Sequence, residues 1–141
     1  MVKSELAREL AFKRVPGWWP RAYISLLLFR DFKESNYVAP AYSLRKKCKE
    51  YGIGKTTLYK GLNTLINEGL VKKVGGLYML TDDGKQALLI LDMFEREVNR
   101  LNDAGGRAIT ELMRLKRSSF IEHAIHYVEA YIEAIKTFNL L

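Results

Sequence analysis

Apolar residues recur with helical spacing in the first half of the chain, and this pattern predicts three helices. Residues 21–32 form a strongly apolar segment, the expected first core helix, and residues 36–40 follow as a loop that ends at a proline. Residues 41–51 place apolar side chains at i, i+4 and i+7, which is one face of a second helix: Leu44, Cys48 and Tyr51. In residues 55–68, the third helix, the expected buried stripe is Leu58, Leu62, Leu65 and Ile66.

Glycines separate these elements and introduce a β-hairpin. Gly52 follows the second helix directly, where a C-terminus favours the left-handed conformation, and Gly54 is the expected N-cap of the third helix. Beyond the third helix the period changes from helical to extended, and two short β-prone runs, 70–74 and 77–80, flank a pair of glycines. A two-residue turn with positive φ at both glycines would join these runs into a hairpin.

The second half of the chain has a longer helical pattern. Thr81 is expected to cap a helix with a heptad-like apolar seam, which residues 102–106 interrupt. Residues 107–138 then carry two adjacent apolar stripes, more apolar surface than one packing partner can cover, so we expect two copies of the chain to pair here. The residues expected at this dimer interface are Phe94, Val98, Leu101, Phe120, Ile121, Ala124, Tyr131 and Ile132.

The pattern therefore divides the chain into three regions. Residues 1–20 form an N-terminal arm, with a short helix followed by a segment that two prolines interrupt. Residues 21–84 form a compact domain, and residues 85–141 form the helical dimerisation region. In the arm, Trp18 and Trp19 are expected to pack against the first core helix rather than to stack on nucleic-acid bases.

Composition narrows the class of protein. Of the 141 residues 48% are hydrophobic and 28% are charged, which is typical of a globular chain. The sequence has no apolar run of the ~18 residues that a membrane span needs, and its charged N-terminus lacks the apolar core of a secretion signal. The single cysteine, Cys48, rules out a disulfide framework and a Cys-based zinc site within one chain. We therefore expect a cytoplasmic, nucleoid-associated protein with no membrane partner.

The distribution of charge indicates a polyanionic partner. Residues 1–82 contain 15 lysines and arginines against 7 aspartates and glutamates, whereas residues 83–141 contain 8 against 9. All of the excess positive charge therefore lies in the first half, as expected of a phosphate-binding half joined to a neutral partner-binding half.

The order of elements in this basic half, three helices followed by a hairpin, predicts a winged helix-turn-helix. The fold class is thus mainly α, a winged helix-turn-helix followed by a dimerisation element of long C-terminal helices. The apolar stripe of helix 55–68 would dock it on the other two helices and leave a polar and basic face that fits a DNA major groove. Cations of the second helix and of the hairpin would contact phosphates. The candidate DNA-binding residues are Lys55, Thr56, Thr57, Tyr59, Lys60, Asn63, Thr64, Lys72, Lys73, Arg45 and Lys46, with Lys47 and Lys49 beside them.

Two segments in this region carry a family resemblance. The residues TTLYKGLNTLINEGLVKK at 56–73 and YMLTDDGKQAL at 78–88 resemble the core of PadR-type transcriptional regulators, and MarR-like winged-helix regulators share the L-T-x-x-G ending. The resemblance implies a homodimeric repressor that dimerises through C-terminal helices. It also implies that Lys55, Thr56, Tyr59 and Lys60 occupy recognition-helix positions that face DNA.

The sequence contains partial motifs for a phosphate-binding loop and for a metal site, and neither motif is complete. The segment GIGKT at 52–56 resembles the end of a phosphate-binding loop, but the required earlier glycine is Lys49 and a helix precedes the segment. His123 and His126 lie on a polar helix face with no matching ligands, so we expect no metal site. No nucleophile, base or acid arrangement suggests an enzyme, and no cofactor is expected.

We therefore expect a sequence-specific transcriptional regulator, most simply a repressor, which binds double-stranded DNA as a homodimer on an inverted repeat. Two alternatives stay open. One is an architectural chromatin protein that tolerates any sequence, and the other is a winged-helix protein-interaction module of the transcription or replication machinery. A small-molecule effector stays open as well, although nothing in the sequence indicates one.

Overall fold

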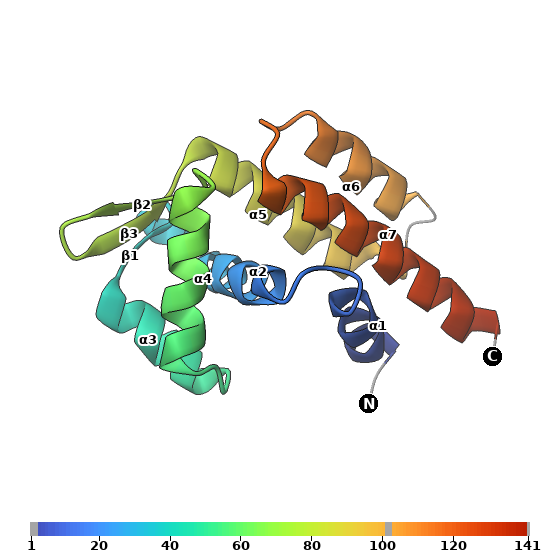
Figure 1. Ribbon diagram of the computed structural model, residues 1–141, viewed down its shortest axis with the longest axis horizontal. Helices are drawn as coiled ribbons and strands as arrows, with labels where there is room; N and C mark the ends of the chain where they lie inside the picture. Colours follow the sequence, from blue (N-terminus) through green and yellow to red (C-terminus); the bar gives the residue numbers. More distant parts are fainter. Residues whose placement is uncertain (1–2, 101–102, 141) are drawn as a thin grey trace. The chain divides into compact units, whose positions relative to one another are not determined.

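The computed structural model describes residues 3–100 and 103–140 (Figure 1). Within these residues the protein is mainly α-helical, with seven α-helices, one 3-10 helix and a small three-stranded antiparallel sheet. The chain forms two compact units: one is Trp18–Leu88, and the other combines Met1–Gly17 with Leu89–Leu141. The expected N-terminal arm is thus no separate region, because its helix belongs to the same unit as the C-terminal helices. None of the helices in the described ranges has the length and apolarity that a membrane span requires.

The unit Trp18–Leu88 begins with the first core helix, which differs from its prediction at both ends. Helix α2 spans Trp18–Leu28, and a 3-10 helix, η1, continues it over Phe29–Ser35. Pro20 therefore lies inside the first turn of α2. A proline is tolerated there because the N–H groups of a first turn have no acceptor within the helix. Trp19 is fully buried, as expected of a packing residue.

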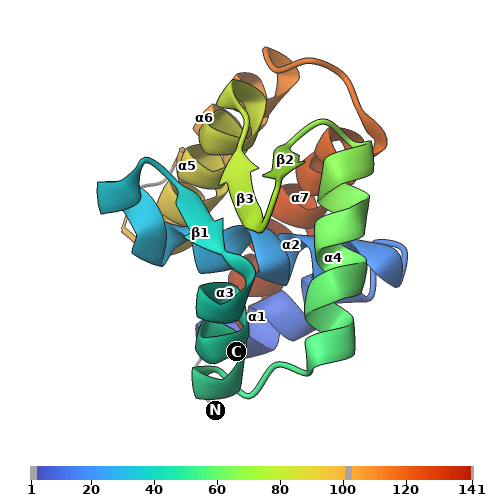
Figure 2. The same ribbon diagram turned by 90° about the vertical axis from the view of Figure 1, so that its left-hand side faces the viewer.

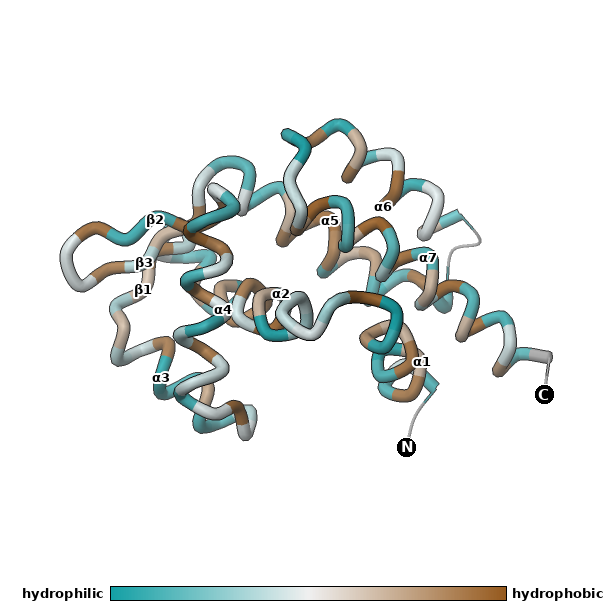
Figure 3. The backbone as a smooth tube through the Cα atoms, viewed as in Figure 1, coloured by the Kyte–Doolittle hydropathy of each residue, from teal (hydrophilic) through white to brown (hydrophobic). Residues whose placement is uncertain are grey.

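The next two helices lie close to their predicted ranges. Helix α3 spans Ala41–Glu50 and buries Leu44 and Cys48. Tyr51, predicted on the same buried face, is instead 53% exposed, because it follows the end of α3 and its hydroxyl donates a hydrogen bond to Asp31. Helix α4 spans Lys55–Asn67 and buries Leu58, Leu62 and Leu65, whereas Ile66 is only half-buried. Figure 3 shows polar and apolar residues alternating along α4.

The hairpin is confirmed, and it belongs to a larger sheet than predicted. Strands β2 (Val71–Val74) and β3 (Leu77–Leu80) pair antiparallel around a two-residue turn. Only Gly75 of that turn has a positive φ, of 60°, so the prediction of positive φ at both glycines is wrong. The predicted loop 36–40 contains a third strand, β1 (Val38–Pro40), which pairs with β3 and gives the order β1-β3-β2 (Figure 2).

The other unit holds helices α1 (Lys3–Phe12), α6 (Ala104–Met113) and α7 (Ser119–Leu140), together with the second half of α5 (Asp82–Glu97). The single helix expected over 107–138 is therefore two helices, separated by residues 114–118. Helix α6 begins within the segment that was expected to interrupt the pattern. Its residue Gly105 lies so close to Ile132 of α7 that a Cβ there would overlap the isoleucine side chain. Helix α7 packs against both α1 and α6 (Figure 1).

This packing overturns the argument for the predicted dimer interface. The apolar stripes of α7 are covered within one chain, because α1 lies along the helix: the Phe12 and Tyr127 rings are 5.4 Å apart, and the Tyr131 hydroxyl donates to the Ser4 carbonyl at 3.3 Å. Of the residues expected at the interface, Val98 and Ile132 are half-buried, and Leu101 lies outside the described residues. The others are buried within this unit: Phe94, Phe120, Ile121, Ala124 and Tyr131.

Candidate nucleic-acid interface

Helix α4 carries most of the predicted site, and its start is fixed by the short connection from α3. Gly52 has a φ of 70°, which lets the chain reverse after α3, and the Ile53 amide donates to the Cys48 carbonyl at 2.8 Å. Gly54 is the N-cap of α4, as predicted. Lys55 and Thr56, the first two residues of the helix, are exposed.

A close contact with α2 fixes the position of α4 along its buried side. Gly61 is buried, and a Cβ at this position would overlap Ser25 Oγ and lie 2.5 Å from the Arg21 carbonyl oxygen. The Ser25 hydroxyl donates to the Leu58 carbonyl at 3.5 Å, so the same serine also contacts the preceding turn of α4. A glycine in a helix interior costs ~1 kcal/mol relative to alanine, and here it permits the two backbones to approach.

The opposite side of α4 presents a strip of exposed residues with i, i+4, i+7 and i+11 spacing. They are Thr56, Lys60, Asn63 and Asn67, and the helix contains no aspartate or glutamate between Lys55 and Asn67. Thr57, Tyr59 and Thr64 were predicted with this set but lie on its flanks and are half-buried. The Thr64 hydroxyl donates to the Lys60 carbonyl at 3.1 Å, so its own helix already supplies its acceptor.

The basic residues of α3 divide, within the described part of the chain, into cations without an acidic partner and one cation that has two. Arg45, Lys46 and Lys49 are exposed. The Lys47 ammonium, in contrast, lies 3.4 Å from Glu50 and 3.5 Å from Asp31, and its hydrogen bond to Glu50 is the main reason that its pKa is raised. Lys47 is therefore engaged within the protein and is a poor candidate for a phosphate contact.

One contact between α3 and α4 was not anticipated from the sequence. Arg45 Nη1 donates a hydrogen bond of 2.8 Å to the hydroxyl oxygen of Tyr59. The pattern could not reveal it, because it depends on how two helices meet across a tight turn. Arg45 and Tyr59 were both predicted site residues, and the structure brings them together on the α3 side of α4.

The β2–β3 hairpin adds two exposed lysines. Their register places them on opposite faces of the sheet, since Lys72 pairs with Met79 and Lys73 with Tyr78. The Lys73 ammonium lies 5.5 Å from the centre of the Tyr78 ring, within the range of a cation–π interaction. The hairpin is also joined to α3, because the Ala41 amide donates to the carbonyl of Gly76 at 3.2 Å.

The predicted site residues thus lie on three elements of one compact unit, which contains twelve lysines and arginines against six aspartates and glutamates. Within the described ranges, all six cations of the predicted set lack an acidic side chain within ion-pair distance, as does Lys49 beside them: Arg45, Lys46, Lys55, Lys60, Lys72 and Lys73.

The residues considered for other chemistry lie elsewhere. Cys48 lies on the buried face of α3, and desolvation raises the pKa of its thiol. The His123 and His126 rings are 5.7 Å apart on α7. No group of three or more histidine, cysteine, aspartate or glutamate side chains in the part of the chain that the structure describes could hold a metal ion.

Comparison with models of protein families, with curated proteins and with solved structures finds no match to this chain.

Proposed function

We propose that the unit Trp18–Leu88 is a winged helix-turn-helix that binds double-stranded DNA, with α4 as the recognition helix and β2–β3 as the wing. The observation that carries the proposal is the exposed strip of α4, which is free of acidic residues and flanked by cations without acidic partners. The resemblance of residues 56–73 and 78–88 to PadR-type regulators supports the same assignment.

The side chains of the strip fit the edges of bases. Asparagine amides pair with adenine through two hydrogen bonds, lysine donates to guanine, and the threonine hydroxyl donates or accepts. The cations around the strip suit phosphates, whose contacts position a protein on DNA without reading its sequence. A helix with this division between base and phosphate contacts is expected to select one DNA sequence, and we propose transcriptional regulation, most simply repression, as the result.

The test is selection of duplexes from a random pool, followed by competition at physiological salt against excess random DNA. We expect the wild-type protein to retain the selected duplex. Lys60→Ala and Thr56→Ala should each weaken binding of the selected duplex by ~1–3 kcal/mol and relax the sequence preference at one base pair. Lys116→Ala is the matched control, since it removes an exposed lysine from the other unit and should leave binding unchanged.

Each alternative function gives a different result. An architectural chromatin protein would bind every duplex with similar affinity, and selection would yield no common sequence. A protein-interaction module would shift no duplex at all. Either result would refute sequence-specific regulation, and unchanged binding by both α4 variants would refute the assignment of α4.

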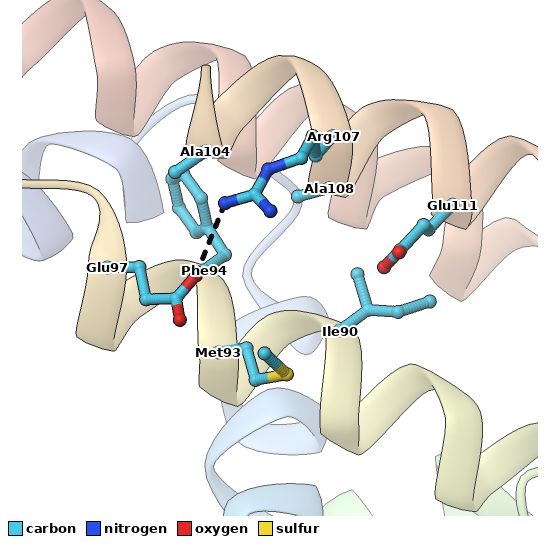
Figure 4. A pocket seen from close by; sticks show the side chains of 8 residues that line it. All are labelled: Ile90, Met93, Phe94, Glu97, Ala104, Arg107, Ala108 and Glu111. Carbon is cyan, nitrogen blue, oxygen red and sulfur yellow. Dashed lines mark hydrogen bonds and ion pairs between the residues drawn. The ribbon is translucent and has the colours of Figure 1, made fainter. Parts of the chain in front are cut away.

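We also propose that the regulator acts as a homodimer through an exposed apolar face of α5, in place of the covered stripes of α7. Leu89 and Met93 are one helical turn apart and are 48% and 52% exposed. Beside them a groove of about 70 Å³ lies between α5 and α6, with an ion pair of 3.4 Å between Glu97 and Arg107 at its edge (Figure 4). A border with both signs of charge is self-complementary, as a two-fold interface requires. A homodimer that binds consecutive major grooves on one face of DNA would recognise an inverted repeat with half-sites ~34 Å apart.

A further inference from the structure

We propose that Arg45 and Tyr59 together form a clamp for a single phosphate group, which bridges α3 and α4. The inference rests on the proposed function in one respect, namely that the phosphate belongs to the DNA backbone. It assigns two roles to Tyr59: its hydroxyl donates a hydrogen bond to the phosphate, and its oxygen positions Arg45. The sequence alone suggested only that Tyr59 contacts DNA as part of the recognition helix.

The donors and acceptors of the Arg45 and Tyr59 side chains lead to this assignment. Arg45 Nη1 donates to the Tyr59 oxygen at 2.8 Å. A guanidinium has no acceptor, so the phenolic hydrogen cannot return to Arg45 and is available to another acceptor. The guanidinium also keeps its remaining N–H donors. The two side chains therefore present adjacent donors of one charged unit.

The charge of this unit is not neutralised by the protein. In the described ranges no carboxylate lies within ion-pair distance of Arg45, in contrast to Lys47 on the same helix, which contacts both Asp31 and Glu50. Arg45 is exposed and Tyr59 is half-buried, so an anion can reach the pair from solvent. Arginine favours phosphate oxygens because its planar fork binds two of them at once.

The position of Tyr59 on α4, with Arg45 beside it on α3, favours a phosphate over a base. Successive helix residues are rotated by ~100°, which puts Tyr59 on the flank that faces α3, away from the centre of the strip formed by Thr56, Asn63 and Lys60. A helix seated in the major groove directs its centre toward base edges, and its flanks lie nearest to the phosphates on either side. The hydrogen bond to Tyr59 holds Arg45 at this border.

A double-mutant cycle on the selected duplex tests the clamp. Tyr59→Phe keeps the ring and removes only the hydroxyl, and Arg45→Gln removes the charge. We expect each variant to weaken binding about 10- to 150-fold, the range that corresponds to the loss of one charge-assisted hydrogen bond. The double variant should bind about as weakly as the weaker single variant, with no change in sequence preference.

The salt dependence supplies a readout that a purely structural role would not change. Arg45→Gln should reduce the slope of log affinity against log salt by about one unit. Tyr59→Phe should reduce the slope as well, although it removes no charge, because the guanidinium is no longer held against the phosphate. The matched control combines Tyr59→Phe with Lys46→Gln. Lys46 is an exposed residue next to Arg45 for which no contact with Tyr59 is seen, so the losses of affinity caused by these two substitutions should multiply.

Titration with inorganic phosphate, against chloride at equal ionic strength, separates the clamp from the proposed function. We expect the Arg45 side-chain NMR signals to shift with phosphate in the wild type and to stay unchanged in Tyr59→Phe. If phosphate shifts the Arg45 signals only in the wild type and no duplex binds, the Arg45–Tyr59 clamp is supported as a phosphate site and the proposal of DNA binding is refuted. Three results would overturn the clamp while duplex binding stands: multiplicative effects of the two variants, an altered base preference in Tyr59→Phe, or Arg45 signals that neither phosphate nor duplex shifts.

Discussion

Gly61→Ala is the substitution that most directly tests how α4 is held. The added Cβ would overlap Ser25 Oγ and would lie 2.5 Å from the Arg21 carbonyl oxygen and 2.9 Å from Ser25 Cβ. Rotation of the serine side chain can relieve the first overlap. The carbonyl belongs to the α2 backbone, so relief of the second contact requires α4 to move away from α2.

Two opposing effects set the magnitude. Alanine favours a helix over glycine by ~1 kcal/mol, which taken alone would stabilise α4. Overpacking of a close backbone contact costs ~1–3 kcal/mol, and the upper end applies where the obstacle is backbone. We therefore expect a net loss of ~2 kcal/mol in the free energy of unfolding. For a unit of this size that loss corresponds to a decrease in Tm of ~8–16 °C.

Unfolding of this unit can be followed separately, because Trp18 and Trp19, the two tryptophans of the chain, both lie in α2. Tryptophan fluorescence during urea denaturation is therefore the assay. Gly76→Ala is the control, since its Cβ would meet no atom within 4 Å and its φ lies outside the positive range. Addition of Ser25→Ala should restore only part of the stability, because the Arg21 carbonyl remains. A Gly61→Ala protein as stable as the wild type would refute the close α2–α4 contact.

Three further predictions concern other residues. Burial raises the pKa of Glu95 more than the nearby charge of Arg8 lowers it, so the folded protein holds this proton more tightly than the unfolded chain. Stability should therefore fall as the pH rises through the range above the usual glutamate pKa, and Glu95→Gln should flatten that part of a denaturation curve measured against pH. Lys72→Ala should weaken all duplexes alike and lower the salt slope by about one unit, and an altered sequence preference would contradict this. Met93→Lys should shift sedimentation toward the monomer, whereas Met113→Lys, which removes an equally exposed methionine outside the groove, should not.

Local patterns were sufficient to predict the hairpin and α4. The hairpin follows from two short β-prone runs around a glycine pair, and α4 follows from a glycine cap and leucines with helical spacing. Strand β1 could not be found in this way. It spans three residues, Val38–Pro40, and forms only because β3, far along the chain, offers an edge. Its own residues contain a proline and too few positions to show alternation.

The candidate site was predicted as a set of residues but without its internal contacts. Exposure of Lys60 and Asn63 follows directly from the helical period. The hydrogen bond from Arg45 to Tyr59 and the ion pair of Lys47 with Asp31 depend on where α3 meets α4 and η1, which no single-helix pattern encodes. The pair of Lys47 with Glu50 is different, because its i, i+3 spacing within α3 could have been found from the sequence.

The dimer interface shows what such a pattern does and does not determine. Two apolar stripes on α7 correctly indicated a helix that is covered on two sides, but the period of a helix does not identify what covers it. The chain supplies both covers itself, with α1 along one stripe and α6 beside the other, and the Arg8–Glu95 ion pair of 2.9 Å joins α1 to α5 in the same unit. A monomeric protein would therefore leave no large exposed patch on α7. The case for pairing now depends on Leu89 and Met93, a smaller apolar surface, so we expect a dimer that dissociates more readily on dilution than one built on α7.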